Sequence, residues 1–385
     1  MRTFTRTLTC IAWVAMSAIS CGTMPTAPGE RVTVTGLIQD RDGNPVSNAY
    51  ISFQARSRLI PYGGSAVTDA SGHYRIDVSE ARYDVYVHAL GFADAVVRDR
   101  EISKDRRRLD YRFTGYWVTG ALTGPNGTTL PGAEVYASGT TLAQPRVESG
   151  HYSVLLPAGS YDFHFRPGYG VLGLPEILVE LSVSRDTTLD VAIDGNVVTG
   201  TVTGPGGGPL AGAEIYASSE HATVTQGTDL NGHYEIRVPT GSYLIRVMPP
   251  DALSFIASRQ AVIPVSSPMT LDFDLSGTRW SGFVRLASDS TPVAGARVFA
   301  TEGGYAASAS ASSDATGRFQ FVVRTGGVYQ IQTYVGNGSY HATPFSVEAG
   351  ADSTFDIYLE PGSEIVSAGP LSMTAPPPSS RWRRP

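Results

Sequence analysis

Short stretches of this chain alternate strictly between apolar and polar residues. The stretch His233–Val238 places Tyr, Ile and Val on one face and His, Glu and Arg on the other. The stretch Tyr243–Val247 repeats the alternation with Tyr, Ile and Val. A period of two predicts β-strands that bury one face. No segment carries an apolar stripe with the period of a helix, so the pattern predicts an all-β protein.

The same pattern occurs four times along the chain. Each copy opens on a glycine that leads into a strand, continues through a Gly-His-Tyr or Gly-Arg-Phe turn, and ends on a Leu-Asp or Phe-Asp pair. The opening glycines are Gly36, Gly120, Gly200 and Gly282, and the closing aspartates are Asp110, Asp190, Asp272 and Asp356. A repeat of roughly 80 residues is too long for a solenoid unit and long enough for an independent fold.

The repeats predict four tandem seven-stranded β-sandwich domains of the Ig-like or prealbumin-like kind. We place these domains at residues 31–114, 115–195, 196–277 and 278–362. Residues 1–20 form a predicted signal peptide, and residues 21–30 a linker that begins with a cysteine. Residues 363–385 form a Pro- and Arg-rich tail that we expect to be disordered.

The chain start has the layout of a secretory leader, with an apolar stretch between Leu8 and Ile19 that is too short to span a bilayer. The residues Ser17–Cys21 resemble the bacterial lipobox, whose cysteine is lipidated and becomes the mature N-terminus. Cys21 is therefore the predicted lipidation site, and Gly22 after it favours the bacterial outer membrane, facing the periplasm or the cell surface. Cleavage by ordinary signal peptidase, giving a secreted protein, is the alternative.

Composition agrees with a turn-rich β-protein. The chain has 42 glycines and 25 prolines, and only 17% of its residues are charged. Its net charge of −6 argues against nucleic acid as a partner. The predicted partners are the membrane, through the lipid anchor, and a protein or polysaccharide.

A family resemblance follows from motifs of the third repeat. Its Gly208–Ile215, Thr228–Ile236 and Pro239–Tyr243 segments resemble the carboxypeptidase regulatory-like domain, a transthyretin-like β-sandwich. The resemblance covers about residues 31–362. It implies the fold, but little about function, because such domains occur in many proteins and no residue of the motif has a known chemical duty.

The sequence carries no catalytic motif that we recognise. No histidine is followed three residues later by the glutamate of a carboxypeptidase zinc pair, and no nucleophile elbow or phosphate-binding loop is present. His73, His151 and His233 occupy the same place in separate repeats, so we expect them to lie apart on turns or outward strand faces. We predict no enzyme activity, no cofactor and no metal site.

Binding of sugars needs exposed aromatic rings. Trp280 replaces a strand valine of the other repeats and is predicted to be core. The candidate carbohydrate-binding residues are Trp117, Tyr62, Tyr169, Tyr305 and Tyr340. The sequence thus predicts a non-enzymatic cell-envelope lipoprotein whose repeats serve as a structural spacer and protein-interaction array. A carbohydrate-binding envelope protein is the alternative.

Overall fold

The structure is a computed structural model, and almost all of its described part is β-strand and turn. It describes residues 30–56, 63–130, 132–168, 171–303, 307–336 and 340–361. The predicted signal peptide, the Cys21 linker and the C-terminal tail lie outside these residues. The helices in the described part, Pro125–Gly127 and Asp251–Leu253, are 3-10 turns of three residues, and neither qualifies as a membrane span.

Contacts between residues divide the chain into two compact units. Unit 1 comprises Met1–Ala89 and Asp94–Phe113, and unit 2 comprises Leu90–Ala93 and Thr114–Pro385. Both are built of β-sheets, so the all-β prediction is confirmed. The division into four domains stays a prediction, and we use the term repeats one to four for the four predicted segments.

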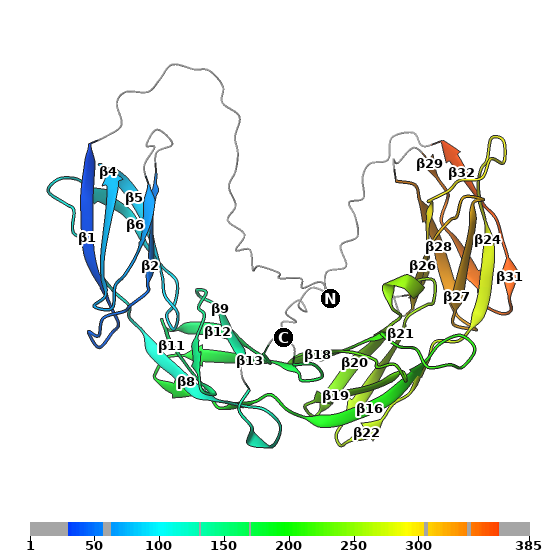
Figure 1. The fold of residues 1–385 in the computed structure, drawn as a ribbon, viewed down its shortest axis with the longest axis horizontal. Coiled ribbons are helices and arrows are strands. Elements are labelled where there is room, and N and C mark those ends of the chain that lie inside the picture. Colours follow the sequence, from blue (N-terminus) through cyan, green and yellow to red (C-terminus); the bar gives the residue numbers. More distant parts are fainter. Residues whose placement is uncertain are drawn as a thin grey trace, which may run out of the picture. The chain divides into compact units, whose positions relative to one another are not determined.

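Unit 1 contains two β-sheets that pack face to face (Figure 1). Its strands are β1 Arg31–Gln39, β2 Tyr50–Ala55, β3 Gly64–Val67, β4 His73–Ser79, β5 Ala81–His88, β6 Ala95–Ile102 and β7 Tyr111–Arg112. One sheet has the order β4-β1-β7 and the other β3-β2-β5-β6. Strands β1 and β4 run antiparallel, whereas the short closing strand β7 runs parallel to β1. The N-terminal and C-terminal strands of the repeat therefore lie together in one sheet.

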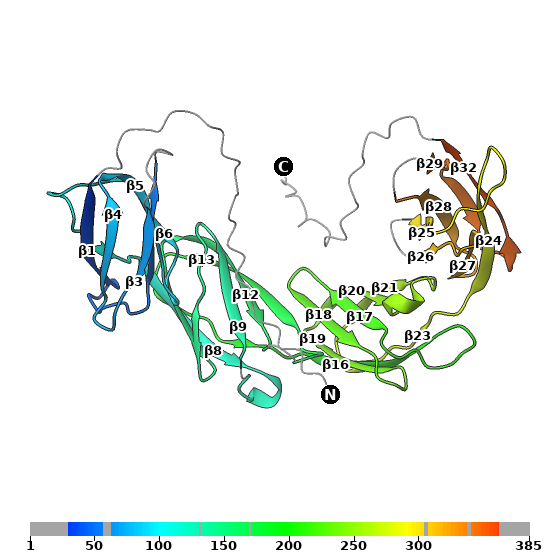
Figure 2. The ribbon, with the colours of Figure 1, turned by 45° about the horizontal axis from the view of Figure 1, so that its top comes forward.

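Unit 2 uses the same strand order with local variations (Figure 2). Repeat two contains β8 Tyr116–Thr123, η1 Pro125–Gly127, β9 Glu134–Gly139, β10 Arg146–Glu148, β11 His151–Leu156, β12 Gly159–Arg166, β13 Glu176–Val183, β14 Thr187–Thr188 and β15 Val191–Ala192. Repeat three contains β16 Asn196–Thr203, β17 Glu214–Ser218, β18 Ala222–Gly227, β19 His233–Val238, β20 Gly241–Met248, η2 Asp251–Leu253, β21 Arg259–Val265, β22 Met269–Thr270 and β23 Phe273–Asp274. Repeat four contains β24 Thr278–Leu286, β25 Arg297–Glu302, β26 Ser308–Ser312, β27 Arg318–Val323, β28 Val328–Tyr334, β29 Tyr340–His341, β30 Phe345–Glu348, β31 Ser353–Thr354 and β32 Ile357–Pro361.

The predicted inward rows form the cores. Tyr234, Ile236 and Val238 are all buried, and the row on the next strand, with Tyr243 and Ile245, is buried beside it. Repeats two, three and four each have a cluster of buried apolar side chains, and each cluster also takes in one residue from a neighbouring predicted segment: Ala93, Val322 and Ala257. Trp280 is fully buried in the cluster of repeat four, as its sequence position predicts.

In three repeats, an aspartate-glycine turn precedes the strand that carries the inward-facing Tyr74, Tyr234 or Phe319. In repeat three, Oδ1 of Asp229 accepts hydrogen bonds from the backbone N–H groups of Asn231 and His233, both at 2.8 Å. Gly232 in this turn has a φ of 73°, a conformation that side chains with a Cβ rarely adopt. Asp69 and Asp314 make the same two kinds of hydrogen bond in repeats one and four.

Repeat two builds this turn differently because it has no aspartate there. Its strand β10 pairs directly with β11, and the two are joined by Ser149 and Gly150. Both residues have positive φ, at 50° and 77°, as in the type I′ turns of two-residue hairpins. In the other repeats the strand before the turn pairs instead with the strand that precedes it. In repeat two, the absence of the aspartate therefore accompanies a change of sheet: the strand before the turn, β10, belongs to the sheet that contains β11 and β8.

The opening glycine of each repeat lies where two strands and a ring crowd together. A Cβ on Gly200 would overlap the carbonyl oxygen of Leu271, and it would come within 3.0 Å of the Tyr234 ring. The hydroxyl of Tyr234 donates a hydrogen bond of 2.6 Å to that same carbonyl oxygen. Repeats one and two contain the same arrangement. Repeat four keeps the close approach with Phe319, which has no hydroxyl group.

We predict that Gly200→Ala destabilises repeat three by about 1–3 kcal/mol or more, because the added methyl group has no room. Chemical denaturation followed by circular dichroism measures the effect. Gly208→Ala is the matched control, since no atom lies within 4 Å of its Cβ position. Equal midpoints for the two variants would contradict the close-approach explanation.

Candidate functional sites

The closing aspartates are structural residues that join the last strand of a repeat to its first. In repeat three, Oδ1 of Asp272 accepts hydrogen bonds from the backbone N–H (2.7 Å) and the hydroxyl (2.8 Å) of Thr201. These hydrogen bonds lower the pKa of the Asp272 carboxyl. The closing aspartate of every other repeat accepts the corresponding backbone hydrogen bond. In this position the carboxylate takes the place of a backbone carbonyl as the acceptor for an N–H of the opening strand.

The tyrosine beside this aspartate is held as a hydrogen-bond donor. Burial raises the pKa of Tyr234, and the negative charge of Asp272 raises it further. The hydroxyl therefore stays protonated and donates to Leu271 at all physiological pH values. These hydrogen bonds join the opening strand to the closing segment and so stabilise the sheet.

Extended segments of unit 2 hydrogen-bond to the strands β11, β19 and β27, which occupy equivalent positions in their repeats. The N–H of Val322 in β27 donates to the carbonyl of Phe255 at 2.8 Å, and the N–H of Ala257 donates back to Val322 at 2.8 Å. Leu155 in β11 makes the same exchange with Gly91 and Ala93, at 2.9 and 3.1 Å.

The third segment of this kind reaches the strand of repeat three. The N–H of Arg237 in β19 donates to the carbonyl of Gly173 at 2.7 Å, and a return bond is impossible because residue 175 is proline. The three acceptor carbonyls recur one repeat length apart, and the strand residues Leu155, Arg237 and Val322 occupy equivalent positions. We call the three segments that supply these carbonyls the edge segments. They are Gly91–Ala93, Gly173–Pro175 and Phe255–Ala257.

Repeats two and three of unit 2 also share a sheet. Strand β13 pairs antiparallel with β18, through Glu176 with Thr223 and Ile177 with Ala222. The N–H of Leu178 adds a hydrogen bond of 2.8 Å to the carbonyl of His221. One seven-stranded sheet, β21-β20-β17-β18-β13-β12-β9, runs through both repeats as a result.

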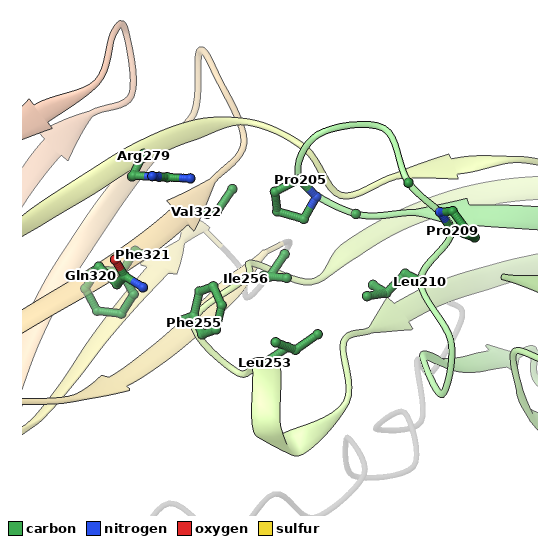
Figure 3. Close-up of a pocket in the computed structure, with 12 residues that line it drawn as sticks. Pro205, Pro209, Leu210, Leu253, Phe255, Ile256, Arg279, Gln320, Phe321 and Val322 are labelled. Carbon is green, nitrogen blue, oxygen red and sulfur yellow. The ribbon is translucent and has the colours of Figure 1, made fainter. Parts of the chain in front are cut away.

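A hollow of about 400 Å³ lies beside the third edge segment (Figure 3). Leu253, Phe255 and Ile256 lie between the turn that holds Pro205 and Pro209 and the strands of repeat four, as Figure 3 shows. Arg279 is its one charged lining residue. The lining is mostly apolar, so the hollow is suited to packing or to binding an apolar group.

Two of the candidate aromatic residues lie in the described part of the chain. The Trp117 ring is half-buried and contacts the Phe92 ring edge-on, with centroids 5.8 Å apart. Tyr340 in β29 is half-buried and packs against the cluster of repeat four. The two rings lie in different repeats with different neighbours. Tyr62, Tyr169 and Tyr305 lie outside the described residues, so the predicted sugar site stays a prediction.

The three matching histidines are exposed at the starts of β4, β11 and β19. Within the residues that the structure describes, no group of three or more His, Cys, Asp or Glu side chains is placed to hold a metal ion. Sequence reasoning did not identify the edge segments. They share only small or apolar residues, and nothing in such short stretches marks them as a contact between repeats.

Comparison with protein families decides the classification. The model of the carboxypeptidase regulatory-like domain matches residues 33–114, 197–276 and 280–360. The chain belongs to this family. Repeat two is not matched, although its opening glycine, tyrosine and closing aspartate make the contacts seen in the matched repeats. Carboxypeptidase regulatory-like domains are regulatory and structural modules.

A comparison with curated proteins found no match. Solved structures with similarity include the Bacillus anthracis TIE protein, at 12% identity, covering 87% of this chain and 76% of that one, with a TM-score of 0.19. The shaft pilin SpaA from Lactobacillus rhamnosus GG has 10% identity over 44% of this chain and 99% of its own, with a TM-score of 0.22. A streptococcal ancillary pilin has 11% identity over 64% of this chain and 100% of its own, at 0.22. TM-scores this low support no inference about function.

We predict that Asp272→Asn lowers the free energy of unfolding by about 1 kcal/mol at neutral pH, because the carboxylate loses its charge-assisted hydrogen bonds. Since folding lowers the pKa of Asp272, its contribution is complete above the ordinary carboxyl pKa. It is lost as the pH falls from about 5 through the lowered pKa, so the two proteins should converge in acid.

Denaturation midpoints from pH 7 to pH 2 measure this convergence. Asp251→Asn is the control in the same repeat, because Asp251 is exposed, lies in the short helix η2 and takes no part in the joint between the first and last strands. A difference between Asp272→Asn and the unchanged protein that stays constant down to pH 2 would exclude the charge as the cause.

Proposed function

We propose that this chain is a non-enzymatic cell-envelope lipoprotein whose tandem carboxypeptidase regulatory-like repeats act as a structural spacer and protein-interaction array. The observation that carries the proposal is the hydrogen bonding between repeats in unit 2. Strand β13 pairs with β18, and Phe255–Ala257 bonds to β27. Backbone bonds of this kind resist bending more than a flexible linker does.

The family supports the non-enzymatic part of this proposal. Carboxypeptidase regulatory-like domains are regulatory and structural modules, and the shared motifs here are used for strand joints and turns. Gly200, Tyr234 and Asp272 all help to hold the first and last strands of repeat three together. Their recurrence in the chain thus has a structural explanation.

The cellular location rests on the sequence. Cys21 follows a leader that resembles a bacterial lipoprotein signal, and the mature chain has no further cysteine. Lipidation of Cys21 would hold the repeats at the bacterial outer membrane, with the array extending into the periplasm or away from the cell. A secreted protein is the alternative, and the first experiment below distinguishes the two.

We predict that Cys21→Ala moves the protein from the membrane fraction to the soluble fraction, because the anchor is attached to this thiol. Fractionation with immunoblotting measures the distribution, and intact mass shows the lipid. Cys10→Ala is the matched control, since Cys10 lies in the predicted leader. Membrane association that survives Cys21→Ala would contradict the anchor.

We predict that Leu178→Pro loosens repeats two and three relative to each other. Proline removes the N–H that bonds to His221, while the ladder between β12 and β13 on the other side of the strand is kept. Spin labels on exposed Ser160 and Glu214, in a chain with Cys21 removed, report the distance distribution.

The expected result is a clearly broader distribution for Leu178→Pro than for the unchanged chain. Glu180→Pro is the matched control, because its N–H faces the same edge of β13 and has no partner among the described residues. Equal widths for all three proteins would argue against a stiff spacer.

A further inference from the structure

The edge of β4 in unit 1 is the counterpart of the strand edges that the edge segments occupy. Its residue Asp77 is equivalent to Leu155, Arg237 and Val322. Among the described residues, β4 pairs only with β1, at the end of the sheet β4-β1-β7. No described backbone group bonds to its outer side at Arg75 or Asp77.

The register of β1 and β4 shows which backbone groups face outward. Ile38 donates to Gly72 and Glu80 donates to Glu30, so the even-numbered residues of β4 bond to β1. The N–H and C=O groups of Arg75 and Asp77 therefore point away from the sheet. Among the described residues, this edge therefore offers unpaired backbone groups to another strand.

Charged side chains do not prevent such an edge from being covered. In repeat three the covered strand β19 carries Glu235 and Arg237 at the positions of Arg75 and Asp77, and Arg237 still donates its N–H to Gly173. What the charges determine is the kind of strand that fits. For favourable charge pairing, a strand on β4 needs an acidic residue opposite Arg75 and a basic residue opposite Asp77.

The strand β4 itself meets this requirement when it is read in the opposite direction. Two copies related by a twofold axis at Ile76 place Arg75 of each copy opposite Asp77 of the other. Both side chains are exposed, and Asp77 uses one carboxylate oxygen to accept a 2.6 Å hydrogen bond from Thr33. The second oxygen is available to the arginine of the second copy.

We propose that two copies of this chain associate through the β4 edge, as antiparallel strands with reciprocal Arg75–Asp77 pairs. The proposal rests on the proposed function, since it names one partner of the interaction array. It assigns the occupant from charge complementarity and from the covered equivalents of this edge in unit 2.

Charge exchange tests the proposal in the mature chain with Cys21→Ala. Sedimentation velocity should show a concentration-dependent dimer, and Asp77→Arg or Arg75→Asp should each reduce the association constant about tenfold or more, since like charges then face each other. Asp105→Arg, an exposed change elsewhere in unit 1, should leave it unchanged.

Mixing the two single variants is the decisive measurement. Asp77→Arg supplies a strand with two arginines and Arg75→Asp one with two aspartates, so the mixture should form a heterodimer at least as well as the unchanged chain. Formation of that heterodimer also shows that both variants are folded. Slower hydrogen exchange at the Asp77 amide on dimerisation would locate the contact at β4.

Three results would overturn the proposal: an unchanged chain that stays monomeric at its highest soluble concentration, single variants that dimerise normally, or a mixture that does not associate. A monomeric chain would leave an unrelated extended segment as the occupant of this edge. None of these results bears on the Leu178→Pro or Cys21→Ala experiments, so the spacer and anchor proposals can fail separately.

Discussion

The close approach of three strands at one glycine organises every repeat. The carbonyl oxygen of Leu271, on the closing segment, lies so near Gly200 that no side chain fits there. The ring of Tyr234 covers the same spot and donates its hydroxyl to that oxygen, while Asp272 receives the next N–H of the opening strand. Because the first and last strands meet at this point, the repeat closes on itself.

Repeat two shows which features the fold can lose. It keeps the joint of Gly120 and Tyr152, but it has no aspartate-glycine turn and moves β10 to the opposite sheet. Repeat four keeps the close approach although Phe319 replaces the tyrosine. Backbone proximity is therefore the constant, and the hydroxyl bond and the turn are supports that can vary.

Edges of the same strand recur as the places where repeats interact. In unit 2, Leu155, Arg237 and Val322 receive an extended segment through one or two backbone hydrogen bonds. Such bonds tolerate many side chains, which explains why leucine, arginine and valine all occur there.

The sequence by itself determined the β-strands, the buried rows and the four repeats, because period-two alternation and the Gly, Tyr and Asp motifs act within a repeat. It also placed Trp280 in the core and identified the family. Tertiary structure decided the rest. Only the pairing shows why Gly200 must be glycine, and only backbone geometry reveals Gly91–Ala93 and Phe255–Ala257 as contacts. Main-chain hydrogen bonds are the same for every residue except proline, so they leave little trace in the sequence.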